Sequence, residues 1–478
     1  MTKLTQINKD ITYKPHQEYG IRWMIEREAD SVVCGGILCD EMGLGKTIQM
    51  IGLIKNAVIE PGEKNLLITP VAVLEQWKKL AAASDINVFV PSTSGMSWES
   101  QGKKNSLAPG MYCIGYEAAR SKPWLTNTYQ WERLIYDEAH RLASGNTSTE
   151  LAEYIETKKR WLLTGTPIVN KVNNLSTLLR LIGVKNISST NIVSLSPSIN
   201  KYVLARNMEQ LRASIPDAPK APIHQTIELD FLTKEEEIFY HTKVNIISQR
   251  LSKLGTNSSQ GATIERLKLI MRLRQVSLHP QIYNESRKKQ LKSMWTQPDW
   301  LATSTKFEAI RKQVLAKESH KWIIFCHFKH EMQLLEELLK GESAIELVQQ
   351  YHGGLSSAQR EQVIDKSRMP IMEGKQEVLL IQLQSGGTGL NLQHFDRIIF
   401  TGPWWTTALM NQAIGRAVRI GQTQQVLVYH IHLKVESDNV MDNIDRFIAE
   451  KAKEKGELCA KALQMATSFI TPADLNTK

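Results

Sequence analysis

The sequence contains few cysteines, and their spacing excludes the structures that cysteines usually support. Only 5 occur in 478 residues, an odd number, and no two form a Cys-x-x-Cys pair. This pattern argues against a disulfide framework and against a structural zinc site. The chain also lacks a run of about 18 apolar residues that could span a membrane, and its first fifteen residues lack the apolar core of a signal peptide. We therefore expect an intracellular protein without a membrane segment.

The composition is that of a soluble globular protein, with 42% hydrophobic and 23% charged residues. No low-complexity tail, heptad run or fixed-period repeat is present. A chain of 478 residues has room for two or three domains, each with its own core. The net charge of +10 permits a polyanionic partner such as nucleic acid, although a basic enzyme can carry the same charge.

The octet DEMGLGKT, from Asp40 to Thr47, has the residues that bind a magnesium nucleotide. Gly43 and Gly45 let backbone N–H groups approach phosphate oxygens, Lys46 neutralises the β and γ phosphates, and the Thr47 hydroxyl ligates Mg²⁺. The general phosphate-loop pattern has glycine where this chain has Asp40, so the octet alone is a partial match. A short apolar run at 35–39 and a helical pattern at 48–57 give the strand, loop and helix order that this chemistry requires.

A pair of carboxylates, Asp137 and Glu138, follows the apolar run 133–136. Such a run would place both carboxylates at the carboxyl edge of a parallel sheet, where ligands of open α/β sheets bind. Asp137 would complete the metal site, and Glu138 would orient or deprotonate the attacking water. The sequence thus predicts ATP and Mg²⁺ as cofactors, with Lys46, Asp137 and Glu138 as catalytic residues and Thr47 and Asp137 as metal ligands.

Apolar runs alternate with helical patterns in two separate parts of the chain, which predicts α/β lobes with parallel sheets. Strands are expected at 35–39, 66–69, 112–115, 133–136, 161–163, 322–325, 378–383, 397–400 and 426–431. Helices are expected at 233–254, 262–274, 330–340 and 409–418. We therefore predict an N-terminal ATP-binding lobe at 1–230, a helical insertion and linker at 231–300, and a C-terminal lobe at 301–478.

Two arginines three residues apart, Arg416 and Arg419, lie in the segment 411–422 and are expected on one helix face. They are candidate arginine fingers. An arginine that reaches the γ phosphate increases the rate about 10³- to 10⁵-fold, so the second lobe would supply the groups that complete the catalytic site.

Several segments of the chain resemble the SWI/SNF-type ATPases of helicase superfamily two, and the resemblance extends over nearly the whole sequence. The segments that resemble the family's motifs are Tyr13 to Gly20, Asp40 to Thr47, Asp137 to Leu142, Leu163 to Pro167, Ser385 to Leu392 and Gln412 to Gln422. In the fourth motif the chain departs from the family, because Cys326 and His327 replace the more usual serine and glutamine.

This resemblance implies two RecA-like lobes and adds residues to the nucleotide site. Gln17 is expected to recognise adenine, and Asp40 and Gln412 join the nucleotide-binding set. In the family's order, Asp137 to Leu142 resembles the second motif and Leu163 to Pro167 the third. The third motif is expected to couple the nucleotide state to lobe movement, and His140 to bridge toward the interface between the lobes.

Members of the family use ATP to move along duplex DNA, usually without separating its strands, and the resemblance implies the same here. Each lobe would hold the sugar-phosphate backbone with N–H groups and hydroxyls, which fix position without reading bases. The residues at matching positions are Thr69, Tyr116, Gly354, Ser356, Arg360 and Thr388. The implied partners are duplex DNA and nucleoprotein or transcription complexes, and the motor is expected to be monomeric and to act in the nucleus of a eukaryotic cell or otherwise in the cytoplasm.

Other functions remain open at this point. One is a strand-separating DEAH-like helicase of RNA or DNA, although the segment 416–422 resembles the duplex translocators more closely. Another is a viral-type nucleoside triphosphatase associated with transcription. A third is a nucleotide-gated scaffold, which would have no use for Glu138 or for the two arginines.

Overall fold

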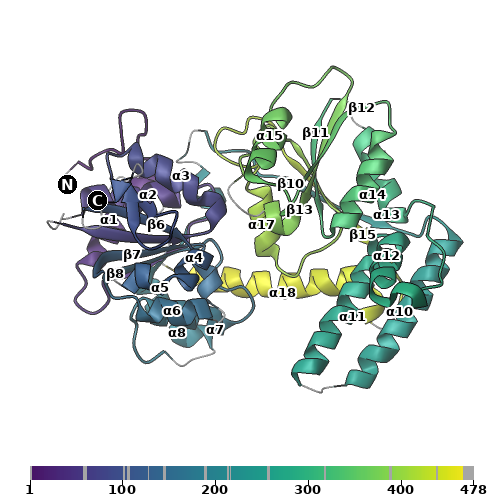
Figure 1. The fold of residues 1–478 in the computed structure, drawn as a ribbon, viewed down its shortest axis with the longest axis horizontal. Coiled ribbons are helices and arrows are strands. Elements are labelled where there is room, and N and C mark those ends of the chain that lie inside the picture. The colour runs from purple at the N-terminus through teal and green to yellow at the C-terminus, as the bar shows by residue number, and fades with distance from the viewer. Residues whose placement is uncertain are drawn as a thin grey trace. The chain divides into compact units, whose positions relative to one another are not determined.

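The computed structural model describes residues 3–57, 62–100, 103–104, 108–127, 129–143, 147–187, 191–212, 215, 217–255, 259–316, 319–386, 390–437 and 440–466. The chain forms two compact units, the first from Met1–Ala218 with Glu454–Lys478 and the second from Pro219–Lys453. Each unit is built around one sheet (Figure 1). Across the described ranges, no helix is both long and apolar enough to cross a membrane.

The sheet of the first unit has nine strands in the order β5-β4-β3-β6-β2-β7-β8-β1-β9. Their bounds are β1 (Gly35–Leu38), β2 (Lys64–Thr69), β3 (Val88–Pro91), β4 (Trp98–Ser100), β5 (Lys103–Lys104), β6 (Gly110–Gly115), β7 (Trp131–Asp137), β8 (Thr157–Leu163) and β9 (Val203–Leu204). All neighbours from β3 to β9 are parallel, whereas β4 pairs antiparallel with β3 and β5.

Helices cover both faces of this sheet, which explains why its central strands are apolar at consecutive positions. In β2, Leu67 belongs to the core beneath α1 (Pro15–Glu28), α2 (Lys46–Asn56) and α3 (Val71–Ala82). The next residue, Ile68, belongs to the opposite core, beneath α7 (Val172–Leu181) and α8 (Ile192–Tyr202). The shorter helices of this unit are α4 (Tyr116–Ser121), α5 (Pro123–Asn127), the 3₁₀ turn η1 (Ala139–Leu142), α6 (Thr147–Tyr154) and α9 (Met208–Leu211).

The sheet of the second unit has six parallel strands in the order β10-β15-β14-β11-β13-β12. Their bounds are β10 (Ile223–Leu229), β11 (Lys321–Cys326), β12 (Ile345–Tyr351), β13 (Gln376–Gln382), β14 (Arg397–Phe400) and β15 (Leu427–Leu433). In β11, Ile324 packs beneath α13 (Thr305–Leu315) and α14 (Lys329–Lys340), while Ile323 and Phe325 pack beneath α15 (Ser357–Ser367) and α17 (Thr407–Ile414). Figure 1 shows these two pairs of helices on opposite sides of the sheet.

Three helices lie between β10 and β11 in the chain: α10 (Lys234–Leu254), α11 (Gln260–Leu278) and α12 (Pro280–Leu291). They pack on a core that also receives Ile444 and Ile448 from α18 (Ile444–Met465), whose last turns belong to the first unit. The remaining short elements are η3 (Lys292–Met294), α16 (Leu383–Gly386) and η4 (Val440–Asp442). The expected fold class, two parallel α/β lobes with a helical segment between their sequences, is confirmed, whereas the division of the chain at residues 230 and 300 stays a prediction.

Candidate nucleotide site and nucleic-acid surface

The predicted nucleotide-binding segments of the first unit meet at one edge of its sheet. Strands β1, β2, β6, β7 and β8 run parallel, so their carboxyl ends lie at the same edge. The residues that end or follow these strands are Asp40 to Lys46, Thr69, Tyr116, Asp137 with Glu138, and Thr164.

The phosphate loop has the backbone conformation that its glycines permit. Gly43 has a φ of 90° and Gly45 a φ of 81°. Residues that carry a side chain rarely adopt such positive φ angles. A Cβ at Gly45 would also lie 2.4 Å from the Nε2 atom of Gln17. Lys46 begins α2, and its Nζ donates to the backbone oxygens of Asp40 at 2.6 Å and Glu41 at 3.4 Å. The ammonium group therefore lies within the curve of the loop, next to a helix N-terminus suited to phosphate.

Asp40, which replaces the usual glycine of the loop, is completely buried. Its carboxylate accepts from Arg206 Nε at 2.9 Å and Nη2 at 2.6 Å, and from Gln49 Nε2 at 2.9 Å. Burial raises the pKa of Asp40, but the charge and hydrogen bonds of Arg206 and the bond from Gln49 outweigh it and lower that pKa. The carboxylate is thus ionised and bound to protein groups.

The predicted adenine residue, Gln17, lies directly against the loop. Its side-chain Nε2 donates to the Leu44 carbonyl at 3.2 Å, and its Oε1 accepts from the Lys14 N–H at 3.0 Å. Thr47 is half-buried in the first turn of α2. Gln412, by contrast, lies on α17 of the second unit, where it is 9% exposed. The structure therefore brings Gln17 and Thr47 to one loop, and the roles of all three in binding nucleotide stay predictions.

Asp137 ends β7 inside a shell of hydrogen-bond donors. It accepts from the Thr69 hydroxyl at 3.2 Å, the Trp77 indole at 2.8 Å and the Glu138 N–H at 3.0 Å. Burial and then the charge of Glu138 raise the pKa of Asp137, so a nearby cation would favour its ionised form. Within the described ranges no group of three or more His, Cys, Asp or Glu residues could hold a metal ion. A magnesium ion here would need hydroxyl and phosphate oxygens, and the Thr47 hydroxyl fits that requirement.

Glu138 and His140 connect the second motif to the third. Glu138 has a φ of 52°, uncommon for a residue with a side chain, and His140 Nδ1 lies 3.4 Å from its Oε2. The same ring nitrogen is 3.2 Å from the Thr164 hydroxyl. Burial, and then the charge of Arg141, lowers the pKa of His140 to about 4, so the ring is neutral at pH 7. His140 was expected to bridge toward the second lobe, and this stays a prediction. Within the first unit, it contacts Thr164 of the third motif.

Two predicted DNA contacts of the first unit, Thr69 and Tyr116, bind Asp137 through their side chains. Thr69 is fully buried, and the Tyr116 hydroxyl donates to the Asp137 carbonyl at 2.8 Å. These hydroxyls support the second motif, and any contact of these residues with DNA stays a prediction.

The expectation that Arg416 and Arg419 share a helix face is wrong. Helix α17 ends at Ile414, four residues before the predicted end, and the arginines lie in the turns that follow. The Arg416 carbonyl accepts from the Leu392 N–H at 3.0 Å, a bond from outside the helix. Arg416 is 3% exposed, and burial lowers the pKa of Arg419. Their action as arginine fingers stays a prediction.

Three predicted DNA residues of the second unit lie together in the turn after β12 and the first turn of α15. Ser356 caps α15 by accepting from the Gln359 N–H at 3.3 Å, and Arg360 Nη2 donates to the Gly353 carbonyl at 2.9 Å. A Cβ at Gly354 would lie 2.8 Å from the Nζ of Lys329, a cation that the sequence reading did not include. The sixth predicted contact, Thr388, falls outside the described residues.

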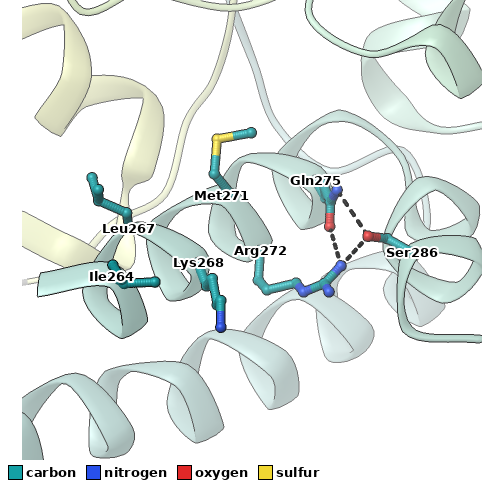
Figure 2. Close-up of a pocket in the computed structure, with 7 residues that line it drawn as sticks. All are labelled: Ile264, Leu267, Lys268, Met271, Arg272, Gln275 and Ser286. Atoms are coloured by element: carbon teal, nitrogen blue, oxygen red, sulfur yellow. Dashed lines mark hydrogen bonds between the residues drawn. The ribbon is translucent and has the colours of Figure 1, made fainter. Parts of the chain in front are cut away.

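A surface pocket of about 320 Å³ lies in the second unit, between α11 and α12, and contains none of the predicted site residues. Figure 2 shows its lining, which consists of Ile264, Leu267, Lys268, Met271, Arg272, Gln275 and Ser286. Arg272 is occupied within the protein, because its Nη1 donates to Gln275 Oε1 at 2.9 Å and also to the Ser286 hydroxyl.

Parallel α/β units with a phosphate loop followed by an Asp-Glu pair define the class of helicase-like nucleotide hydrolases. The model of the SNF2-related domain matches residues 16–282, more than half of the chain, and the model of the helicase conserved C-terminal domain matches residues 305–421. The chain therefore belongs to the SNF2-related family of helicase-like ATPases, a family that uses nucleotide.

Similar proteins come from viruses, plants and yeasts. The chain is 26% identical to the "Probable global transactivator" of Orgyia pseudotsugata multicapsid polyhedrosis virus, over 92% of this chain and 89% of that protein. It is 27% identical to the "Probable ATP-dependent DNA helicase CHR12" of Arabidopsis thaliana, over 94% of this chain, and 28% identical to the "Chromatin remodeling factor mit1" of Schizosaccharomyces pombe, over 93%. It spans only 42% and 32%, respectively, of those two relatives.

A solved structure, the Sulfolobus solfataricus SWI2/SNF2 ATPase core in complex with dsDNA, is 21% identical, with 98% of this chain and 100% of that chain covered. Its TM-score of 0.43 is too low for a structural argument, so the family assignment rests on the family models.

Proposed function

We propose that the protein is a DNA-dependent ATPase that couples ATP hydrolysis to translocation on duplex DNA and so remodels protein–DNA complexes or branched DNA. The main support is the convergence of the phosphate loop, Asp137 with Glu138, and Thr164 at one sheet edge. Family membership across both halves of the chain supports it further.

In this proposal each group at the edge has one task. Lys46 binds the β and γ phosphates, and Thr47 with Asp137 holds Mg²⁺, which when bound neutralises charge on those phosphates. Glu138 orients the attacking water. Gln17 contacts adenine.

The second unit completes the reaction. Arg416 and Arg419 act as arginine fingers, with Gln412 as a further nucleotide contact. A finger that reaches the γ phosphate only in one arrangement of the units would make hydrolysis depend on their movement.

The DNA track is formed by backbone and short polar groups that bind phosphates. Gly354, Ser356 and Arg360 of the second unit contribute, together with Thr69 and Tyr116 of the first unit and Thr388. Such contacts give sequence-independent affinity, which falls with salt on a log-log slope of about −0.9 for each phosphate neutralised. The site of action follows the DNA, in the nucleus of a eukaryotic cell or otherwise in the cytoplasm, and the motor works as a monomer.

The test compares ATP hydrolysis by the purified protein with blunt duplex DNA, single-stranded DNA and RNA at equal nucleotide concentration. Duplex DNA is expected to stimulate most, and ATP-dependent displacement of a triplex-forming strand is expected to report movement. Stronger stimulation by RNA would favour a strand-separating helicase. Nucleotide binding without hydrolysis under any condition would favour a scaffold.

A second candidate setting is transcription, because the viral relative named as a probable global transactivator matches along 89% of its length. In this setting the motor acts on transcription complexes. ATP-dependent release of a polymerase stalled on duplex DNA, in preference to displacement of a nucleosome, would support this setting. The opposite preference would argue against it.

A further inference from the structure

Arg206 occupies a central place beside the phosphate loop, although no motif of the sequence pointed to it. Its guanidinium is 4% exposed and binds both carboxylate oxygens of Asp40, at 2.9 Å and 2.6 Å. It also donates to Gln49 Oε1 at 2.8 Å and to the His16 carbonyl. One side chain thus connects the loop after β1 with α2 and with the beginning of α1.

The backbone around Arg206 continues the sheet past the end of β1. Leu38 pairs with Leu204, and beyond that pair the Cys39 N–H donates to the Leu204 carbonyl at 2.6 Å. The Glu41 N–H then donates to the Arg206 carbonyl at 2.8 Å. The segment after β9 therefore fixes the first half of the loop through its main chain, and the Arg206 side chain fixes it through Asp40.

A side chain at Gly20 would have no room beside this guanidinium. A Cβ at Gly20 would lie 1.9 Å from Gln49 Oε1 and 3.0 Å from Arg206 Nη2. The Gln49 amide uses both its ends, donating to Asp40 and accepting from Arg206. The arrangement is thus a closed, buried hydrogen-bond network, in which loss of one charge leaves the other uncompensated.

The effect on chemistry passes through Lys46. Its ammonium group is held by the carbonyls of Asp40 and Glu41, at 2.6 Å and 3.4 Å. These carbonyls belong to the part of the loop that Arg206 and its neighbours fix. A shift of this part would move the phosphate-binding lysine.

We propose that Arg206 is a positioning residue for the nucleotide site, which holds the first half of the phosphate loop through the buried Asp40 carboxylate. Asp40 then serves this internal contact and does not touch the nucleotide. The proposal explains why this chain has aspartate where the general loop pattern has glycine. It rests on the proposed use of ATP by this loop.

The experiment compares Arg206→Met with Arg133→Met in the full chain. Arg133 is the matched control, because its fully buried side chain pairs with Glu28 at 2.6 Å. It lies near the start of β7, whereas Asp137 is the last residue of that strand. For each variant we would measure the Kd of a fluorescent ADP analogue, the KM and kcat for ATP with duplex DNA, and the Tm. Arg206→Met is expected to raise the Kd and KM about 10²-fold, because a misplaced loop loses its binding geometry. Arg133→Met is expected to lower the Tm while changing the Kd less than about 2-fold.

Further variants separate positioning from folding. Asp40→Asn combined with Arg206→Met removes both charges and is expected to bind nucleotide more tightly than Arg206→Met alone, because no buried carboxylate is left unpaired. Arg206→Lys keeps one charge without the two-point contact and is expected to fold with about 10-fold weaker nucleotide binding. Wild-type affinity in Arg206→Lys or Arg206→Met, or an equal loss in Arg133→Met, would overturn the proposal. Failure of the wild-type protein to bind nucleotide would instead overturn the proposed function.

Discussion

Glu138 combines a left-handed backbone with a side chain that is 19% exposed, next to the half-buried Asp137. We expect Glu138→Gln to bind ATP normally and to hydrolyse it about 10²- to 10⁴-fold more slowly, because the amide cannot accept a proton from water. Phosphate release with saturating duplex DNA gives kcat, and a fluorescent nucleotide gives the Kd.

Glu132→Gln is the control for this change, since Glu132 lies on the same strand and pairs with Lys158 at 3.0 Å and Lys159 at 2.9 Å. Its kcat should stay near that of the wild type. Turnover that survives in Glu138→Gln would show that another group orients the water.

At the residue scale, the sequence identified groups that belong to a linear motif and missed groups that reach the site from elsewhere. Lys46, Asp137 and Glu138 were predicted because their residue types and order match a chemical requirement, and their catalytic roles stay predictions. Arg206 contacts Asp40 from 166 positions away, and the Trp77 indole reaches Asp137 from 60 positions away. Neither residue type carries a local signal, so only the fold could reveal these contacts.

At the scale of elements, the turn that carries Arg416 and Arg419 is held by Gln422. The Gln422 Nε2 donates to the carbonyls of Gln393 at 2.7 Å, Phe395 at 3.1 Å and Ala417 at 3.3 Å. We expect Gln422→Leu to lower kcat about 10- to 10²-fold, because the arginines lose their positions. Its nucleotide affinity should be unchanged, since the loop and Gln17 belong to the other unit and Gln412 lies on α17, before this turn.

Gln425→Leu is the matched control for that element. Its Nε2 donates to the Ala221 carbonyl at 2.6 Å and makes no contact with the arginine turn that the structure describes. Single-turnover hydrolysis and nucleotide titration would be measured on both variants. A parallel loss of affinity and rate in Gln422→Leu would contradict a role confined to the arginines.

Elements with a strong apolar run were predicted well, and elements defined by tertiary contacts were not. Strand β14 has the predicted bounds Arg397–Phe400, because its last three residues, Ile398 to Phe400, form a continuous apolar run. Strand β10 was missed, since Ile223–Leu229 alternates with polar residues and is largely exposed, yet it pairs with β15 along its whole length. The end of α17 was also misplaced, because the contact between Leu392 and Arg416 stops the helix although the sequence favours continuation.

For the whole molecule, buried and half-buried histidines predict how stability depends on pH. Burial is the main cause that lowers the pKa of His16, His140, His394 and His430 to about 4, and that of His279 to about 3. These folded-state values lie below the unfolded value of about 6.5, so below that pH the unfolded chain binds protons that the folded chain does not. Stability should therefore be present above about pH 6.5 and be lost as the pH falls toward 4. Buried carboxylates with raised pKa values, such as Glu236 and Glu331, act in the opposite direction and offset part of this loss.

The contribution of one histidine to this pH dependence of stability can be measured separately. His279 caps α12, because its Nδ1 accepts from the Gln281 N–H at 3.0 Å, and asparagine can accept the same bond without titrating. Between pH 7 and pH 5 a fully buried histidine of this kind costs about 2 kcal/mol of stability. His279→Asn should therefore lose about 2 kcal/mol less than the wild type over this range, measured by urea unfolding followed by tryptophan fluorescence. If both proteins lose the same stability, His279 is protonated in the folded state and its burial does not govern the acid sensitivity of the second unit.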